Sequence, residues 1–486
     1  MSAPPTSAPS RIQPFIRGAF TPSSGDGTFP DLNPSNPDDV VAQVSSGAPD
    51  DAARAAAAAQ EAFDSWRALP GPVRAEHLHK WSEVIGGRRE ALAQAMSREV
   101  GKPIGEARGE VGRGEVILRY YAGEAVRQIG DVIPSQAPDA LQLTLREPLG
   151  VVALITPWNF PFAIPLWKAA PALAFGNTVV LKPAEDASSM ASLLAETAQQ
   201  AGLPAGVFNV IPGTGTTVGP ALLGAGPVRA VSFTGSAAVG ASVAAACAAR
   251  NIRYQTEMGG KNVVIVAADA DLDRAAMLTA AGAMRYAGQK CTATSRAILL
   301  RPIADRFLAR LKEQVEALPL GPVDDPKSAI GPLINARAHA RVSAAVQGAG
   351  EFVTGGAPPT DARFRKGYFF SPTVVRDVAP DSGLATEEVF GPVLATFVVD
   401  DLDQAIALAN RTKYGLSASL FTRDLSSAMR YIRRIEVGLV RVNGDTTGVD
   451  PHAPFGGFKG SSSGSREQGP AAREFYTEIK TVQIHP

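Results

Sequence analysis

From residue 151 onwards, short runs of β-branched and aliphatic residues alternate with longer stretches of helical periodicity. Five of the short runs predict strands, at 151–155, 178–182, 207–211, 228–233 and 252–256. The stretches between them predict helices at 162–175, 187–202 and 237–249. Strands that alternate with helices pair in parallel, because each helix returns the chain to the edge where the previous strand began. The alternation therefore predicts a parallel sheet of Rossmann type.

A second series of the same kind begins near residue 262. It predicts strands at 262–266 and 296–300, helices at 271–286 and 303–318, and further alternation up to residue 442. Before the first series, amphipathic runs predict a helical region at 50–128. Alternating apolar and polar residues at 141–145 predict a strand outside the main sheet, and the same alternation predicts a final strand at 475–484. The first twelve residues are rich in Pro, Ser and Ala, and we interpret them as a flexible tail without a secretory signal.

Length and charge narrow the class of protein. A chain of 486 residues is long enough for two or three domains. Basic and acidic residues balance at 47 each, so no basic excess favours binding to nucleic acid or to an anionic membrane. No apolar run reaches the roughly 18–20 residues that span a bilayer. Two cysteines are too few for a disulfide scaffold, and their spacing predicts no metal site, so we expect a cytoplasmic protein.

Cys291 follows a predicted helix and a glycine. A lone cysteine is more often an inert core residue. Here, polar neighbours and the adjacent Lys290 favour an accessible thiol whose thiolate can be stabilised, as a nucleophile requires. Cys247 lies inside an Ala-rich predicted helix, and we interpret it as a core residue.

Two further side chains follow predicted strands, where ligands bind in open α/β sheets. Glu257 ends a strand, so it can serve as a general base that activates water or simply as a surface carboxylate. Asn159 lies at 156–161 between two prolines, which can hold its amide still as an oxyanion donor. A proline-stiffened packing loop is the alternative interpretation of that segment.

Three strand-to-helix turns have the residues of a nucleotide site. Gly215 and Gly219 open one helix, and Gly235 and Ser236 open another directly after Phe233, so both offer backbone N–H groups to a phosphate. Lys182 and Glu185 end a third strand, where they can bond ribose hydroxyls. An ordinary turn with a solvated charge is the alternative for each.

Taken together and in order, these segments resemble the motifs of the aldehyde dehydrogenase superfamily, from about residue 15 to the C-terminus. The matching segments are 156–161, 182–185, 233–236, 257–261, 288–291, 387–392 and 454–457. The spacing from Glu257 to Cys291 also fits the family. The resemblance implies an α/β protein with a Rossmann-type cofactor domain, an α/β catalytic domain and a small β oligomerisation arm. The implied boundaries are 1–128 with 148–258 for the cofactor domain, 259–452 for the catalytic domain, and 129–147 with 470–486 for the arm, which projects onto a neighbouring subunit in a homodimer or homotetramer.

The resemblance also implies a reaction, NAD(P)-dependent oxidation of an aldehyde to a carboxylate. Cys291 attacks the aldehyde, and the Asn159 amide with the Cys291 N–H holds the oxyanion. A thioester forms on Cys291 after hydride transfer, Glu257 activates the water that hydrolyses it, and Lys168 has a supporting role. The residues implied for cofactor binding are Thr156, Trp158, Lys182, Glu185, Gly215, Gly219, Phe233, Gly235, Ser236, Gly259, Glu388 and Phe390. Because a carboxylate at position 185 repels a 2′-phosphate, NAD is favoured and NADP remains possible.

The implied substrate is a small aldehyde. Segments 291–296, 446–452 and 456–469 are most similar to the α-ketoglutaric semialdehyde dehydrogenase branch, which implies 2,5-dioxopentanoate. The dianionic product of that substrate requires a basic anchor, which Arg285 or Lys290 can supply, and a solvated surface charge is the alternative interpretation of both residues. The aromatic Trp167 instead suits aliphatic or aromatic aldehydes, so a general aldehyde dehydrogenase is the alternative. The CoA-acylating branch lacks the equivalent of Glu257. A catalytically silent member is expected to lose Cys291, Asn159 or Glu257, and this chain has all three.

Overall fold

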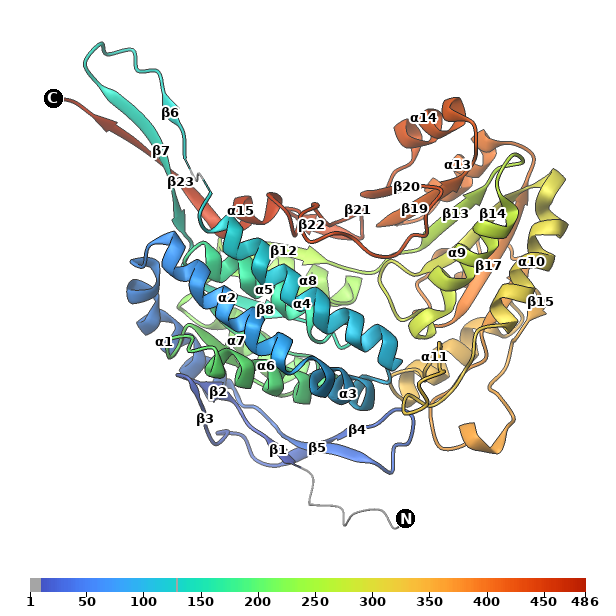
Figure 1. Cartoon of the computed structure of the whole chain (residues 1–486), viewed down its shortest axis with the longest axis horizontal. Helices are drawn as coiled ribbons and strands as arrows, with labels where there is room; N and C mark the ends of the chain where they lie inside the picture. Colours follow the sequence, from blue (N-terminus) through green and yellow to red (C-terminus); the bar gives the residue numbers. More distant parts are fainter. Residues whose placement is uncertain (1–9, 128–129) are drawn as a thin grey trace.

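The computed structural model describes residues 10–127 and 130–486, which form two α/β bodies and a slender β arm (Figure 1). The first body contains an eight-stranded sheet in the order β22-β12-β11-β8-β9-β10-β2-β3. Its antiparallel outer strands are β22 (Ser462–Gly464), β2 (Phe15–Ile16) and β3 (Ala19–Phe20). Its five central strands are parallel: β12 (Arg253–Glu257), β11 (Val228–Thr234), β8 (Val151–Ile155), β9 (Thr178–Lys182) and β10 (Phe208–Val210). The predicted Rossmann-type sheet is therefore confirmed.

Alternate side chains of β8 explain why helices cover both faces of this sheet. Val152 and Leu154 join the core formed with the helices on one face, whereas Val151 and Ala153 join the core on the other. The first face carries α2 (Gly71–Gly87), α3 (Arg89–Val100), α4 (Ile104–Glu124), α5 (Ala163–Ala174) and α6 (Ser188–Gln200). The second carries α1 (Pro49–Arg67), α7 (Gly215–Gly224) and α8 (Ala237–Ala249).

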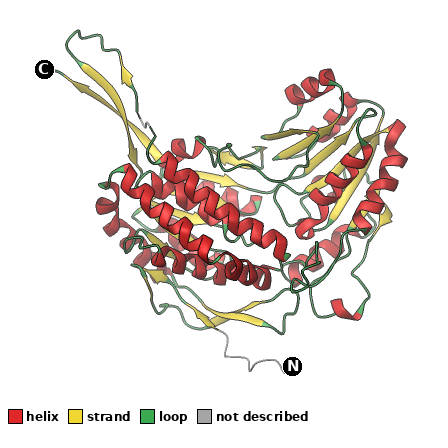
Figure 2. Cartoon of the chain, viewed as in Figure 1, coloured by secondary structure: helices red, strands yellow, loops and turns green. Residues whose placement is uncertain are grey.

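The second body contains a seven-stranded sheet in the order β15-β16-β17-β14-β13-β19-β20. The strands are β13 (Asn262–Val266), β14 (Thr294–Leu300), β15 (Glu351–Thr354), β16 (Thr373–Arg376), β17 (Val393–Val399), β19 (Ser417–Phe421) and β20 (Leu439–Val442). Figure 2 shows helices flanking it, and they include α9 (Leu272–Met284), α10 (Ala304–Glu316), α11 (Ala336–Val346), α13 (Leu402–Asn410) and α14 (Leu425–Arg434). This confirms the second predicted α/β series.

The arm is a three-stranded antiparallel sheet that projects from the first body (Figure 1). Its strands are β6 (Val132–Ile133), β7 (Leu141–Pro148) and β23 (Thr477–Ile484). Every residue of β7 pairs with one of β23, from Leu141 with Ile484 to Pro148 with Thr477. The strand predicted at 141–145, outside the main sheet, is thus confirmed.

Several predicted boundaries are wrong. Phe475 and Tyr476 end helix α15 (Ala471–Tyr476) instead of starting the last strand, because both aromatic side chains are buried in the core of the first body. Helix α9 stops at Met284, and Tyr286 then adopts a left-handed backbone with φ of 55°. Residues Ser10–Ile12 were predicted within a flexible tail but form β1, which pairs with β5 (Val40–Ser45) in a separate three-stranded sheet with β4 (Thr28–Leu32). The remainder of the predicted tail, residues 1–9, lies outside the described residues.

Within the described parts of the chain, none of the helices combines the length and apolar character needed to cross a membrane.

Candidate active site

Cys291 lies at a cleft of about 480 Å³ whose walls come from both bodies. Of the residues predicted from the sequence, those that line it are Trp158, Asn159, Gly235, Ser236, Gly259, Cys291, Glu388 and Phe390. The Cys291 thiol is partly exposed, whereas Cys247 is buried in α8. The accessible thiol predicted at Cys291 and the core role predicted for Cys247 both agree with this placement.

The charge around Cys291 differs from the prediction. Burial raises the pKa of the Cys291 thiol to about 12, and the carboxylates of Glu388 and Glu257 add to the rise. The ammonium of Lys290 lies 2.9 Å from the carboxylate of Glu106. The prediction that Lys290 stabilises the thiolate is therefore wrong, because its charge is neutralised by an acid that lies far away in the sequence.

Asn159 lies in the loop that follows β8, and its side chain is 3% exposed. Its amide Nδ2 donates to the carbonyl oxygen of Gln289, 3.0 Å away, in the segment that leads to Cys291. An amide nitrogen carries two N–H groups, so a second donor is left for an oxyanion. The structure thus joins the two loops that the sequence singled out separately.

Glu257 ends β12 and is buried beside the edge strand β22 (Ser462–Gly464). The Ser462 hydroxyl donates to its Oε2 at 2.6 Å, while Oε1 has no hydrogen-bond partner among the described residues. Burial, followed by the nearby charge of Glu467, raises the pKa of Glu257 well above its usual value. The free oxygen can therefore accept a proton from water only once the carboxyl has ionised.

Lys168 is buried in α5 and pairs with the carboxylate of Glu467. The Lys168 ammonium also donates to the Ser232 hydroxyl at 2.8 Å, and the Trp167 indole donates to Glu467 at 2.7 Å. Sequence reasoning assigned Lys168 a supporting role but missed Glu467, whose segment served only to compare family branches. A lysine in an otherwise apolar helix requires a buried acid, but the sequence does not show which of the acids supplies it.

Lys182, Glu185 and Gly215 lie together at the carboxyl edge of the first sheet. Glu185 accepts a hydrogen bond from the Gly215 N–H at 2.7 Å, and a Cβ on Gly215 would lie 3.8 Å from the Lys182 ammonium. Burial lowers the pKa of Lys182 to about 8. Thr156 is close by, since its backbone N–H donates to the Lys182 carbonyl oxygen at 3.1 Å and its hydroxyl has no partner among the described residues. Gly219 lies one turn further along α7.

The turn after β11 leads directly into α8. The Ser236 side chain caps this helix by accepting from the Val239 N–H at 3.4 Å. A Cβ on Gly235 would lie 2.5 Å from the Phe233 ring, so glycine alone lets the backbone pass there. This exposed helix N-terminus, in the wall of the cleft, suits a phosphate.

Glu388 and Phe390 close the cleft from the second body. Glu388 accepts from the Gly260 N–H at 3.0 Å, and burial raises its pKa to about 7. A Cβ on Gly259 would lie 2.1 Å from the Glu388 carboxylate, so a side chain at position 259 would collide with it. The rings of Phe390 and Trp158 meet edge to face with centroids 5.6 Å apart. A flat ring and a hydroxylated sugar fit these groups, which therefore suit a dinucleotide. The sequence motifs did not indicate the basic side chains of Arg337, Arg341 and Lys413, which also line the cleft.

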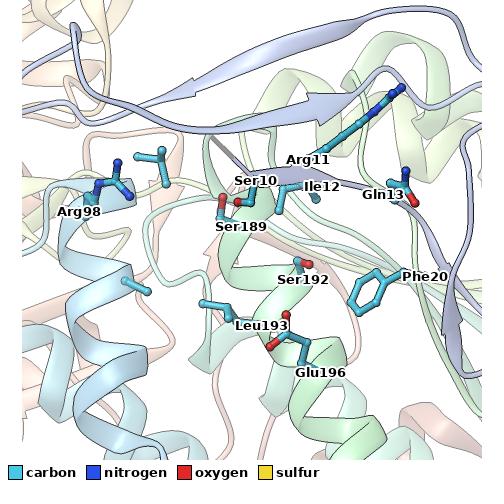
Figure 3. A pocket seen from close by; sticks show the side chains of 12 residues that line it. Ser10, Arg11, Ile12, Gln13, Phe20, Arg98, Ser189, Ser192, Leu193 and Glu196 are labelled. Carbon is cyan, nitrogen blue, oxygen red and sulfur yellow. The ribbon is translucent and has the colours of Figure 1, made fainter. Parts of the chain in front are cut away.

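A second cavity, of about 320 Å³, is shown in Figure 3 and shares no lining residue with the cleft at Cys291. Arg11 and Ile12 of β1, Arg98 of α3, and Ser189 and Glu196 of α6 line it. Arg98 is paired with Asp39 at 2.6 Å. The described residues that line this cavity include no cysteine or histidine, and none of them is in the site around Cys291.

The sequence matches the profile of the Aldehyde dehydrogenase family over residues 20–482. It is 44% identical over 476 residues to an alpha-ketoglutaric semialdehyde dehydrogenase of Bacillus subtilis, covering 97% of this chain and 98% of the relative. It is 39% identical over 465 residues to a 2,5-dioxopentanoate dehydrogenase of Saccharolobus solfataricus, covering 93% and 95% of the two chains. The fold superimposes on a crystal structure of an NAD-dependent aldehyde dehydrogenase from Sinorhizobium meliloti with a TM-score of 0.95 and 38% identity, covering 98% of this chain and 95% of the other.

Proposed function

The chain belongs to the aldehyde dehydrogenase family and is an NAD(P)-dependent oxidoreductase, and on that premise we propose that it oxidises α-ketoglutaric semialdehyde (2,5-dioxopentanoate) through a thioester on Cys291. The observation that carries this proposal is the meeting of the Cys291 thiol and the Asn159 amide, with its free N–H, at one cleft. Glu257, at the end of β12, does not line that cleft, but its charge acts on the Cys291 thiol and one of its oxygens has no partner among the described residues.

The protein groups divide the reaction between them. The Cys291 sulfur, as the thiolate, bonds to the carbonyl carbon, and the oxyanion that forms accepts hydrogen bonds from Asn159 and the Cys291 N–H. A nicotinamide cofactor, which Glu388 and Phe390 would help to hold, would supply the hydride acceptor, and loss of a hydride from the adduct would leave a thioester on Cys291. Glu257 then takes a proton from water as the water oxygen bonds to the thioester carbon, and the C–S bond breaks to release the carboxylate and the Cys291 thiolate.

The two named relatives support the substrate, because both act on the same five-carbon keto acid aldehyde by name and match this chain over nearly its full length. The proposed carboxylate anchors have unequal support. Lys290 is paired with Glu106, whereas Arg285 is exposed. Of the two, Arg285 is therefore the better candidate for binding the substrate carboxylate.

A general aliphatic or aromatic aldehyde dehydrogenase is the alternative, and one observation favours it. Trp167 packs on Phe455 with ring centroids 5.5 Å apart, and Cys291 and Val449 pack against the same apolar cluster as Phe455. An apolar wall beside the thiol accepts an alkyl or aryl group without leaving a polar group unpaired.

Glu185 supports a preference for NAD over NADP. Its carboxylate is held by Gly215 beside Lys182, and a carboxylate at a ribose repels a 2′-phosphate. We propose NAD as the principal cofactor and NADP as a poorer one.

We also propose a cytoplasmic homodimer or homotetramer. Leu141, Leu145, Ile479 and Ile484 of the arm are exposed, and so are Leu425, Met429 and Ile432 of α14, beside the edge strand β20. Exposed apolar side chains on a helix and on a projecting sheet are typical of surfaces that pair with another copy.

The test is a comparison of kcat/KM on a panel of aldehydes with NAD and with NADP. The panel holds 2,5-dioxopentanoate, succinic semialdehyde, benzaldehyde, betaine aldehyde and a medium-chain alkanal, with Cys291→Ala as the control. We expect 2,5-dioxopentanoate to lead and the variant to be inactive. A lead for benzaldehyde or the alkanal would establish the alternative and make Trp167 the residue to study.

A further inference from the structure

Lys102 is a buried cation that none of the steps above uses. It follows the left-handed residue Gly101 at the end of α3, and its side chain is 1% exposed. The α3–α4 connection lies where the two bodies meet (Figure 1), and a Cβ on Gly101 would lie 2.8 Å from the ring of Pro332. A buried ammonium is costly unless several groups compensate it, so its contacts indicate what it holds in place.

The first contact of Lys102 is with the oxyanion loop. Its ammonium donates to the backbone carbonyl oxygen of Asn159 at 2.7 Å. It also lies 4.2 Å from the centroid of the Phe160 ring, in the next residue. A charge-assisted hydrogen bond and a cation–π contact, both desolvated, therefore fix the backbone of the residue that supplies the amide donor.

The second contact is with the segment that leads to the nucleophile. The ammonium lies 4.3 Å from the centroid of the Tyr286 ring. Tyr286 and Ala287 have φ of 55° and 51°, a backbone conformation that non-glycine residues adopt only when their surroundings impose it. Four residues later comes Cys291, and between them Gln289 accepts the hydrogen bond of the Asn159 amide.

The third contact is with Glu110 of α4, whose side chain is also 1% exposed and which pairs with the Lys102 ammonium. The other oxygen of Glu110 accepts from the backbone N–H groups of Phe162 and Ala163, both at 3.0 Å, at the start of α5. A carboxylate at a helix N-terminus is stabilised by the orphan N–H groups and the helix dipole. Glu110 thus anchors the end of the Asn159 loop, at the start of α5, while Lys102 holds the middle of the same loop.

We propose that the Lys102–Glu110 pair is a positioning device that sets the Asn159 amide and the Cys291 N–H at the spacing the oxyanion requires. Neither residue touches the reacting atoms. Their effect passes through Asn159 on one side and through the Tyr286 segment on the other. The inference depends on the cysteine mechanism proposed above but not on the identity of the aldehyde.

The experiment is a double-mutant cycle between Lys102→Met and Asn159→Ala, measured as kcat with the aldehyde that the unaltered enzyme oxidises fastest. Loss of an oxyanion donor costs about 100- to 1000-fold in kcat, and a misplacement of about 1 Å costs up to about 100-fold. We expect Lys102→Met to lower kcat by about 10- to 100-fold in the unaltered enzyme and by less than about threefold in the Asn159→Ala background. Alkylation of Cys291 by iodoacetamide, which forms no oxyanion, should keep its rate.

Two further variants make the result decisive. Glu110→Gln keeps the shape of the acid, and it replaces Lys102→Met in the double-mutant cycle if Lys102→Met does not fold. Glu115→Gln is the matched control, because Glu115 is a buried acid of the same helix α4 that pairs with Arg89, away from the Asn159 loop. Equal losses of kcat in both Asn159 backgrounds would overturn the proposal, as would a loss in Glu115→Gln as large as in Glu110→Gln. A preference for another aldehyde would overturn only the proposed substrate, since the cycle is read with any substrate.

Discussion

Replacing Glu467 by Gln separates the electrostatic role of this buried acid from its structural role. Four donors point at the Glu467 carboxylate: the Trp167 indole, the Lys168 ammonium, the Ser232 hydroxyl and the Gln255 amide. A carboxylate accepts all of them, whereas a glutamine offers one oxygen and turns an N–H₂ group toward the remaining donors. The substitution preserves shape but removes the only negative charge that pairs with Lys168 among the described residues.

The magnitude follows from burial. The side chains of Lys168 and Glu467 are 0% and 2% exposed, so the charge left behind cannot be screened by water. Removing one partner of such a pair costs about 3–5 kcal/mol. We therefore expect the free energy of unfolding to fall by about that amount, seen as a lower urea midpoint.

The same change should make Glu257 a base at lower pH. The charge of Glu467 raises the pKa of Glu257, and Lys168 lowers it. Glu257 accepts a proton only when ionised, so hydrolysis of the acyl-enzyme rises with pH through its pKa. Without the charge of Glu467, and with Lys168 uncompensated, that pKa falls, and the rising limb moves to lower pH.

The assay is hydrolysis of a p-nitrophenyl ester, which acylates Cys291 without oxidation and reports deacylation across the pH range. Glu474→Gln is the control, because Glu474 is half exposed and pairs with Arg146 at the base of the arm. A rising limb that stays in place or moves to higher pH in Glu467→Gln refutes the electrostatic argument, even if the urea midpoint falls.

Three other outcomes are expected. Cys291→Ala should abolish oxidation while Cys247→Ala retains it, and a thiol reagent should label Cys291 first, because Cys247 is buried whereas Cys291 is partly exposed; equal labelling would contradict this. Glu185→Gln should raise kcat/KM with NADP relative to NAD by about tenfold, since it removes a charge worth roughly 1–2 kcal/mol against a 2′-phosphate; steady-state kinetics with both cofactors test it, and an unchanged ratio speaks against Glu185 as the selector. Removing residues 477–486 should leave a smaller species in light scattering, because β7 loses its only partner along its full length; an unchanged mass would exclude the arm from assembly.

The central strands were predicted correctly because each has a recognisable residue pattern of its own. β8 and β9 are runs of apolar residues buried on both faces, and β-branched residues in short runs between helices favour parallel strands. The short outer strands β22 and β2 (Phe15–Ile16) were missed, since segments of two or three residues become strands only through pairing. For the same reason Ser10–Ile12 was predicted to be part of a flexible tail, because the sequence does not show its pairing with β5.

In the site, single residues were predictable and their partnerships were not. Cys291, Asn159 and Glu257 stand in distinctive local segments. Lys168 and Glu467 are 299 residues apart in the chain, and no local pattern joins them. Lys290 was expected to stabilise the thiolate because its partner, Glu106 of α4, lies far away in the sequence. Ion pairs between residues far apart in the chain determine the electrostatics of this site, and the sequence alone does not show which residues pair.

The position of β23 has a consequence for the order in which the protein is made. Translation reaches Cys291, Asn159 and Glu257 well before it reaches Glu467 and the strand Thr477–Ile484. A nascent chain that has reached only the end of β20, the last strand of the second body, therefore still exposes β7 and carries Lys168 without its counter-ion. The arm and the buried ion pair are both completed by the same late segment, so the electrostatics of the site and the proposed pairing of subunits should mature together, after the second body has been made.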